Sequence, residues 1–521
     1  MLELRFLENS TLPRLAWCAR LTAGRDDIAV EHGAWVETGA DWFFEGAWKG
    51  PFDAHAFSRS EIVLGSGAAL RDGELWFTPT THTMERLYSV AAGPAVFVSN
   101  SLAYVLEASG SHLDRRNWSY ESRLLTFLLG YRKAAKHMRL AGGRILSVHY
   151  HVSFCFGAGG DAKRRWRRRA PEPRTLAPPR PPRFETFGEY IDYSREALAR
   201  LKENAVAPRR RVRYEPLATI SSGYDSPACA LLAKTIGCRR AVTFTQARPS
   251  FGPRLESTDD SGEELARRLG LDVERFSRDA YLAESSYPEA PFLATGGGGD
   301  DVVLSTLGER LAGTMFFTGM LGDTLWGTET QDPAASEEYR FRFPAGGSMQ
   351  EFRLHAGFVH VPVPLLTFTR HGDILRISRS EEMSAWRIGG GYDRPIPRRI
   401  LEEQGVPRGS FASEKRAITQ PFWLQRASER CMSRASLADF ERFKRETVRS
   451  YPLGALQMGV MRKGRGAFYK IRKLLARSAR DPYAPTAHLA AATTEPLRFH
   501  WAVEKARAAY RATGLGDETT T

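Results

Sequence analysis

The segment at residues 220–227 constrains the fold of this chain more than any other part of the sequence. It reads Ile-Ser-Ser-Gly-Tyr-Asp-Ser-Pro, with an apolar run at residues 217–220 before the loop and an apolar segment at residues 228–234 after it. This pattern predicts a strand, a tight loop and a helix. Pro227 suits the first helical position, where a missing N–H costs nothing. The chain therefore contains at least one strand-to-helix unit whose loop is rich in serine and glycine.

Such a loop is suited to holding a phosphate group. Backbone N–H groups and hydroxyls at the start of a helix attract anions, and the residues that would supply them are Ser221, Ser222, Gly223 and Ser226. Asp225 would repel an anion, so its expected partner is the Mg²⁺ of a nucleotide such as ATP. The G-x-x-x-x-G-K-[ST] phosphate loop does not occur in the sequence. An ordinary capped turn is the alternative explanation of this segment.

Strands and helices continue to alternate after this loop. Strand-like runs occur at residues 241–244, 271–276 and 314–317, with helix candidates at residues 261–269 and 301–311 between them. This alternation predicts a parallel, doubly wound α/β sheet. Ligands bind such sheets at the carboxyl ends of the strands.

Further site candidates follow from that rule. Phe244 ends the second strand, and Gly319 and Asp323 follow the fourth. We count Phe244 and Gly319 among the cofactor-binding residues. Asp225 and Asp323 are the metal-ligand candidates, because two acids at neighbouring strand ends can hold one Mg²⁺ against a triphosphate.

Composition and charge narrow the class of protein. The chain has 521 residues, 42% of them hydrophobic, which is enough for two substantial cores. No apolar run reaches the roughly 18 residues that a membrane helix needs, and no signal peptide is recognisable. Five scattered cysteines without a C-x-x-C pair favour a reducing, cytoplasmic location. The net charge of +14 suggests anionic partners. Because much of the excess lies in the basic run 163–169 of a Pro-rich stretch, a solvated linker is favoured over a nucleic-acid arm.

That Pro-rich stretch separates regions that differ in composition and in predicted secondary structure. Residues 1–157 carry short aromatic and β-branched runs separated by turn signals, which predicts an antiparallel sheet-on-sheet core. Residues 158–183 are the predicted linker, residues 184–425 the α/β domain, and residues 426–521 a helical C-terminal extension.

The motifs together resemble the asparagine synthetase family of adenylating amide ligases, a branch of the ATP pyrophosphatases. Residues 221–226 are similar to the family's S-G-G-x-D-S, with Ser222 in place of the first Gly. Residues 319–327 resemble its S-G-x-G-x-D-E-x-F-G-G, with Thr324 in place of Glu. Residues 392–400, continuing to 413–416, form the third match. The resemblance covers about residues 30 to 422.

The resemblance implies a glutaminase-like N-terminal domain of N-terminal-nucleophile fold. That domain requires a cysteine directly after the initiator methionine, but Leu2 stands there and the first cysteine is Cys18. We therefore expect a glutaminase-like domain without glutaminase chemistry. The resemblance also implies Lys415 as the residue that stabilises the transition state. Glu289 is the candidate general base, with Asp300 and Asp301 as rivals.

The predicted function is ATP-dependent amide ligation. A small-molecule carboxylate would be adenylated and its acyl group passed to ammonia or an amine, without glutamine hydrolysis, and AMP and pyrophosphate would be released. Three alternatives stay open: asparagine formation from free ammonia, a pyrophosphatase that modifies a nucleobase or tRNA, and a non-catalytic nucleotide-binding protein of the same fold.

Overall fold

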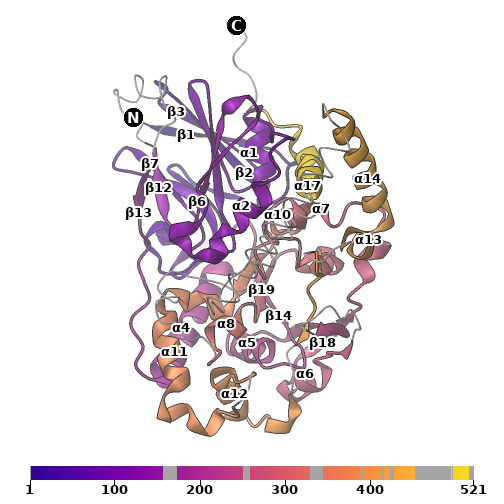
Figure 1. The fold of residues 1–521 in the computed structure, drawn as a ribbon. Helices are drawn as coiled ribbons and strands as arrows, with labels where there is room; N and C mark the ends of the chain where they lie inside the picture. The colour runs from indigo at the N-terminus through magenta and orange to yellow at the C-terminus, as the bar shows by residue number, and fades with distance from the viewer. Residues whose placement is uncertain are drawn as a thin grey trace.

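The computed structural model of the protein has a mixed α/β fold, with a β-rich N-terminal region and a parallel sheet farther along the chain (Figure 1). Among the described helices, none combines the length and apolar character needed to cross a bilayer. The structure describes residues 2–156, 173–249, 258–328, 344–389, 392–411, 416–422, 427–451, 495 and 497–515.

Two sheets form most of the N-terminal region, and nearly all of their neighbouring strands pair antiparallel, β1 with β3 being the parallel exception. The seven-stranded sheet runs, in spatial order, β1 (Glu3–Glu8), β3 (Asp27–His32), β2 (Trp17–Thr22), β9 (Ala95–Ser99), β8 (Leu87–Ala92), β11 (Ile145–His149) and β10 (His137–Arg139). The six-stranded sheet runs β13 (Arg174–Leu176), β12 (Ser153–Cys155), β7 (Glu74–Thr78), β6 (Val63–Arg71), β5 (Trp42–Trp48) and β4 (Glu37–Thr38).

The predicted parallel sheet is present and has five strands. Their spatial order is β18 (Asp272–Phe276), β15 (Arg240–Phe244), β14 (Glu215–Thr219), β19 (Thr314–Thr318) and β20 (Val359–Pro362). Every neighbouring pair in it is parallel. A small antiparallel sheet lies beside it, composed of β17 (Thr258–Asp259), β16 (Gln246–Pro249) and β21 (Arg416–Ala417).

The helices pack around these sheets. They are α1 (Leu102–Ala108), α2 (Tyr120–Leu124), α4 (Phe187–Ala205), α5 (Asp225–Lys234), α6 (Glu263–Leu269), α7 (Ala290–Leu293), α8 (Gly322–Leu325), α10 (Gln350–Ala356), α11 (His371–Arg379), α12 (Pro395–Glu402), α13 (Ala427–Cys431), α14 (Arg434–Arg449) and α17 (Leu497–Arg507). The longer 3₁₀ segments are η7 (Val302–Leu311), η8 (Val363–Arg370) and η9 (Glu381–Trp386).

Strands β15, β14, β19 and β20 of the parallel sheet are buried on both faces, as their apolar residues require, whereas edge strand β18 is mostly exposed. In β19, Phe316 packs into one core cluster, while its neighbours Met315 and Phe317 pack into another. The second cluster contains residues of α4, α5, α6, α11 and α12. Successive side chains of a strand point to opposite faces of the sheet, so each strand contributes residues to both hydrophobic layers.

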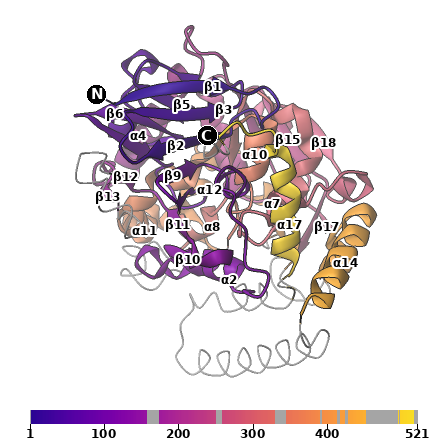
Figure 2. The same ribbon diagram turned by 90° about the horizontal axis from the view of Figure 1, so that it is seen from above.

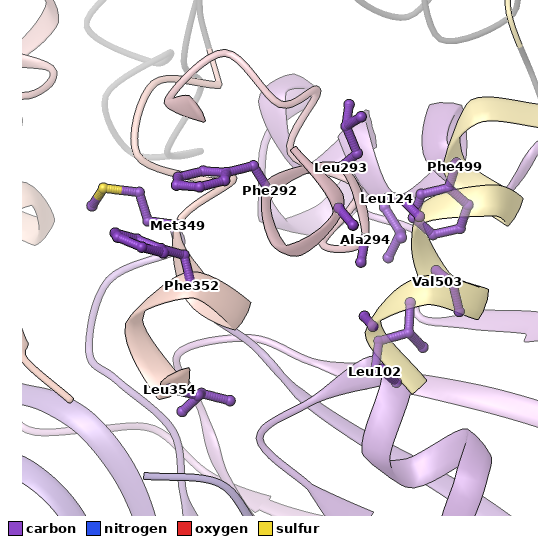
Figure 3. Packing of buried hydrophobic residues seen from close by; sticks show 14 of the residues in the cluster. Leu102, Leu124, Phe292, Leu293, Ala294, Met349, Phe352, Leu354, Phe499 and Val503 are labelled. Atoms are coloured by element: carbon purple, nitrogen blue, oxygen red, sulfur yellow. The ribbon is translucent and has the colours of Figure 1, made fainter. Parts of the chain in front are cut away.

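The first cluster joins segments from all parts of the chain. Figure 3 shows Leu102 of α1 and Leu124 of α2 near Phe499 and Val503 of α17, with Ala294 beside Leu124, whereas Phe292 lies against Phe352 of α10. In the view from above, α17 lies beside α7, and the two helices are in contact (Figure 2). The C-terminal helix therefore completes a core that begins in the N-terminal region.

Several details differ from the sequence-based expectations. The predicted helix at residues 301–311 is a 3₁₀ segment interrupted at Gly308, whose φ of 48° and ψ of −130° break the helical repeat. Part of the predicted linker forms edge strand β13, paired antiparallel with β12, whereas the basic run lies outside the described residues. The fifth parallel strand, β20, was not predicted because it is short and ends in Pro362.

Candidate active site

A cavity of about 250 Å³ lies at the carboxyl ends of β14, β15 and β19. Its wall includes the loop after β14 and the loop after β19, so the two predicted motifs meet in space. The lining residues are Thr219, Ile220, Ser221, Gly223, Tyr224, Asp225, Ser226, Val242, Phe244, Asp260, Asp300, Asp301, Leu304, Thr318, Gly319, Met320, Leu321, Asp323, Ala345, Tyr392, Arg416, Ala417, Ile418 and Thr419.

The serine-rich loop is held by its own hydroxyls. The Oγ atoms of Ser221 and Ser226 lie 2.9 Å apart, and the Gly223 N–H donates to Ser221 Oγ over 3.3 Å. Helix α5 begins at Asp225, two residues earlier than Pro227 suggested, and Pro227 still lies in the first turn, where helix N–H groups lack partners. The ten-residue helix therefore points its positive end at the cavity.

Ser222 differs from the other predicted loop residues because it does not line the cavity. Its hydroxyl donates to the Asp260 carboxylate, and its N–H donates to the Asp260 carbonyl over 3.2 Å. Asp260 therefore fastens this loop, and it also lines the cavity. Burial raises the pKa of the Asp260 carboxyl.

The loop after β19 packs against the first loop backbone to backbone. A Cβ atom on Gly319 would lie 2.7 Å from the carbonyl carbon of Asp225 and 2.7 Å from the nitrogen of Ser226. A Cβ atom on Gly322 would lie 2.7 Å from the carboxyl carbon of Asp225. Between them, Leu321 has a φ of 60°, in the left-handed region that non-glycine residues seldom adopt. Glycine is thus required where the two motifs touch.

Both predicted metal ligands line the cavity. Asp323 lies in the first turn of α8, directly after Gly322, so it is next to the glycine that contacts Asp225. The Oδ1 atom of Asp225 is buried and has no hydrogen-bond partner among the described residues. Two carboxylates fit Mg²⁺, which is usually held by one or two protein carboxylates together with phosphate oxygens and water. In the described ranges, no group of three or more His, Cys, Asp or Glu side chains is placed to bind a metal.

The other oxygen of Asp225 already has a cationic partner that the sequence did not predict. Arg394 Nη1 donates to Asp225 Oδ2 over 2.7 Å. The Arg394 guanidinium lies over the ring of Tyr392, 4.9 Å from its centroid. Burial raises the pKa of Tyr392, so its hydroxyl remains protonated at neutral pH. Arg394 and Tyr392 both belong to the segment that carries the third family match. That match was the sequence signal that could have placed them near the cavity.

The structure does not bring the predicted general base to the cavity. Glu289 is fully buried, and its carboxylate accepts from the N–H of Ser433 and the hydroxyl of Ser436. These contacts fasten it to the start of α14, and it is absent from the cavity lining. Burial raises the pKa of the Glu289 carboxyl.

Asp300 and Asp301, the rivals of Glu289, both line the cavity. The Asp301 carboxylate accepts from the N–H groups of Gly346 and Ser348 and, over 2.6 Å, from the Ser348 hydroxyl. Asp301 therefore holds the segment around residue 346 against the cavity wall, and burial raises the pKa of its carboxyl.

The predicted catalytic lysine lies outside the described residues. Lys415 is followed directly by Arg416, which belongs to β21 and lines the cavity. The Arg416 guanidinium donates to the carbonyl of Asp259. The described end of this segment therefore reaches the cavity from the side of the small antiparallel sheet.

In the N-terminal region, Cys18 occupies the interior of β2. It pairs with Glu31 of β3 on one side and Ser99 of β9 on the other. Its thiol is fully buried, and burial raises its pKa well above the ordinary value. This thiol is therefore in a poor environment for forming a nucleophilic thiolate.

Comparison with protein-family models gave no match, and comparison with curated proteins gave no match either. The family resemblance therefore rests on the loop motifs and the segment beginning at Tyr392. What the geometry adds is their convergence on one cavity.

Proposed function

We propose that the protein is an ATP-dependent amide ligase that adenylates a carboxylate and passes the acyl group to ammonia or an amine. The observation that carries the proposal is the meeting of residues 221–226 and 319–323 at one cavity. A helix N-terminus with serine hydroxyls suits a pyrophosphate, and the adjoining carboxylates suit its metal ion. A parallel sheet places ligands at this end of its strands.

The chain's own residues would divide the work of binding. The N–H groups of Ser221 and Gly223 and the hydroxyl of Ser226 would hold the pyrophosphate, with Gly223 and Ser226 exchanging their bonds to Ser221 Oγ for bonds to phosphate oxygens. Phe244 offers an apolar surface to the rest of the nucleotide. Asp225, through Oδ1, and Asp323 would hold Mg²⁺. Bound there, the ion would neutralise charge on the leaving pyrophosphate.

The reaction would have two balanced steps. An oxygen of the substrate carboxylate attacks the α-phosphorus of ATP, the bond to the β-phosphate oxygen breaks, and pyrophosphate leaves. The nitrogen of ammonia or an amine then attacks the acyl carbon, AMP leaves with the bonding electrons, and the nitrogen loses a proton. Lys415 is the proposed cation for the oxyanion that forms during the second step.

The proposed nitrogen source follows from the N-terminal region. Leu2 stands where the family has its nucleophile, and the Cys18 thiol is buried inside a sheet. We therefore propose free ammonia or an amine-bearing molecule as the acceptor, without glutamine hydrolysis.

Pyrophosphate and AMP release is the direct test. The protein is incubated with ATP, Mg²⁺, hydroxylamine and a panel of small carboxylates, and hydroxamate, pyrophosphate and AMP are measured together. We expect Asp225→Asn and Asp323→Asn each to abolish all three products while the variants retain the wild-type circular dichroism spectrum. Formation of ADP in place of AMP, or full turnover by either variant, would contradict the proposal.

A second candidate is nucleotide binding without turnover. The position of Glu289 favours it, because the predicted general base is engaged at the start of α14 rather than at the cavity. Titration calorimetry with ATP separates the two candidates. Binding that Asp225→Asn weakens, together with no pyrophosphate from any carboxylate in the panel, would favour the binding protein.

A further inference from the structure

The pair formed by Asp225 and Arg394 connects two elements that are far apart in the sequence. Asp225 is the first residue of α5, and Arg394 directly precedes α12, which packs against α5. The ion pair is 2.7 Å long, with the two side chains 18% and 6% exposed, respectively. A pair so shielded from water is firmly held, because removing either partner leaves a buried charge without compensation.

The two oxygens of Asp225 have different surroundings. Oδ2 accepts from Arg394, whereas Oδ1 is buried without a hydrogen-bond partner among the described residues. One carboxylate can therefore serve two cations, with Arg394 on one oxygen and a metal ion on the other. In the absence of metal, Arg394 is the counter-charge of Asp225.

Arg394 also stands beside the serine-rich loop. Its guanidinium covers the ring of Tyr392, and the Tyr392 hydroxyl lies 3.1 Å from the position that a Cβ atom on Gly223 would occupy. Tyr392 and Gly223 both line the cavity. Arg394 is not itself a lining residue, but its guanidinium is bonded to one, Asp225, so its charge lies directly behind the cavity wall. A guanidinium is suited to an anion bound by the loop, since its planar N–H groups match phosphate oxygens in pairs.

We propose that Arg394 is a phosphate-positioning residue whose charge is balanced by Asp225 until metal and nucleotide bind. The proposal rests on the proposed function only in placing a pyrophosphate group in the cavity. It has two consequences of opposite sign. Arg394 weakens metal binding, because it neutralises the carboxylate that would hold the ion. It strengthens pyrophosphate binding, because it adds positive charge beside the loop.

The test measures two affinities without turnover. Binding of Mn²⁺ alone is followed by electron paramagnetic resonance, and binding of inorganic pyrophosphate in excess chelator is followed by calorimetry. We expect Arg394→Gln to bind Mn²⁺ more tightly than the wild type and to bind pyrophosphate about 10- to 100-fold more weakly, the loss typical of one charged contact. The affinities of Arg394→Lys should lie between those of the wild type and Arg394→Gln, because lysine keeps the charge but loses the paired N–H groups.

Two further variants complete the experiment. Asp225→Asn should lose Mn²⁺ binding and bind metal-free pyrophosphate more tightly, because Arg394 is then released from its partner. Arg399→Gln is the matched control on α12, since the ion pairs of Arg399 are with Glu382 and Glu403, neither of which lines the cavity, whereas Arg394 pairs with the lining residue Asp225. Both affinities of Arg399→Gln should equal those of the wild type.

The opposite changes expected for Mn²⁺ affinity and pyrophosphate affinity distinguish a phosphate-positioning role of Arg394 from a purely structural one. If Arg394→Gln lowers both affinities, or changes neither, the proposal is overturned, and it is also overturned if the wild type binds no pyrophosphate. If Arg394→Gln melts at a lower temperature than the wild type, the affinities of Arg394→Lys, which keeps the positive charge, decide the test. Opposite shifts in a protein that never releases pyrophosphate from ATP would refute the proposed ligase activity and leave the role of Arg394 intact.

Discussion

Replacing Gly319 by alanine tests the contact that joins the two loops of the cavity. The added Cβ would lie 2.7 Å from two backbone atoms of residues 225 and 226, whereas ordinary contacts begin near 3.4 Å. The obstruction is backbone, so one loop must move by several tenths of an ångström. Forced overpacking of this kind costs about 1–3 kcal/mol of folding free energy. Because displacement of reacting groups by ~1 Å can cost ~10² in rate, we expect pyrophosphate release to fall by about 10- to 100-fold.

Two measurements on matched variants decide this prediction. Pyrophosphate release from ATP and Mg²⁺ reports the geometry of the cavity, and urea denaturation reports the free energy of unfolding. Gly188→Ala is the control, because a Cβ there meets only Thr186 Oγ1 at 3.8 Å and Gly188 lies within α4. That variant should unfold at the same or a higher urea concentration and keep full turnover. Wild-type turnover and stability in Gly319→Ala would show that this loop contact does not position the substrate.

Three further predictions address single residues. Lys415→Ala should keep ATP affinity and melting temperature while product formation falls by about 10²–10³, the usual loss for one transition-state contact; normal turnover would remove Lys415 from the mechanism. Glu289→Gln should lower the free energy of unfolding by about 1–3 kcal/mol, since a buried acceptor of two hydrogen bonds at the start of α14 is weakened. A loss of turnover with unchanged stability would instead restore Glu289 as the general base. Glutamine should yield no glutamate with or without ATP, and hydrolysis that Cys18→Ala abolishes would contradict this expectation.

Local sequence signals were sufficient for the central part of the fold. The apolar run before Ser221 forms β14, and the segment that begins at Asp225 forms α5. Helix α6 and strand β18 fall within two residues of their predicted starts. These elements form from periodic burial and loop residues close in sequence, which is the information that a pattern contains. Gly308, by contrast, interrupts a segment whose apolar pattern alone looked helical.

The cavity was predictable in part for the same reason. Parallel strands bring their carboxyl ends to one edge, so the residues after β14 and β19 had to meet there. Nothing local distinguished Ser222, whose side chain turns to Asp260, from the serines that line the cavity. The two residues are 38 positions apart, so no local pattern indicated their contact.

Local sequence patterns were enough to specify the strand, loop and helix that present Ser221 to Ser226, and the parallel sheet that positions them. Which charged side chains contact one another followed only from the packing of distant elements. That packing set Arg394 against Asp225, 169 residues away, and fastened Glu289 to the start of α14. Strands and helices could be predicted because their periodic pattern depends on neighbouring residues. The partner of a buried charge depends instead on which elements pack together. This packing depends on the whole core, which includes segments from both ends of the chain.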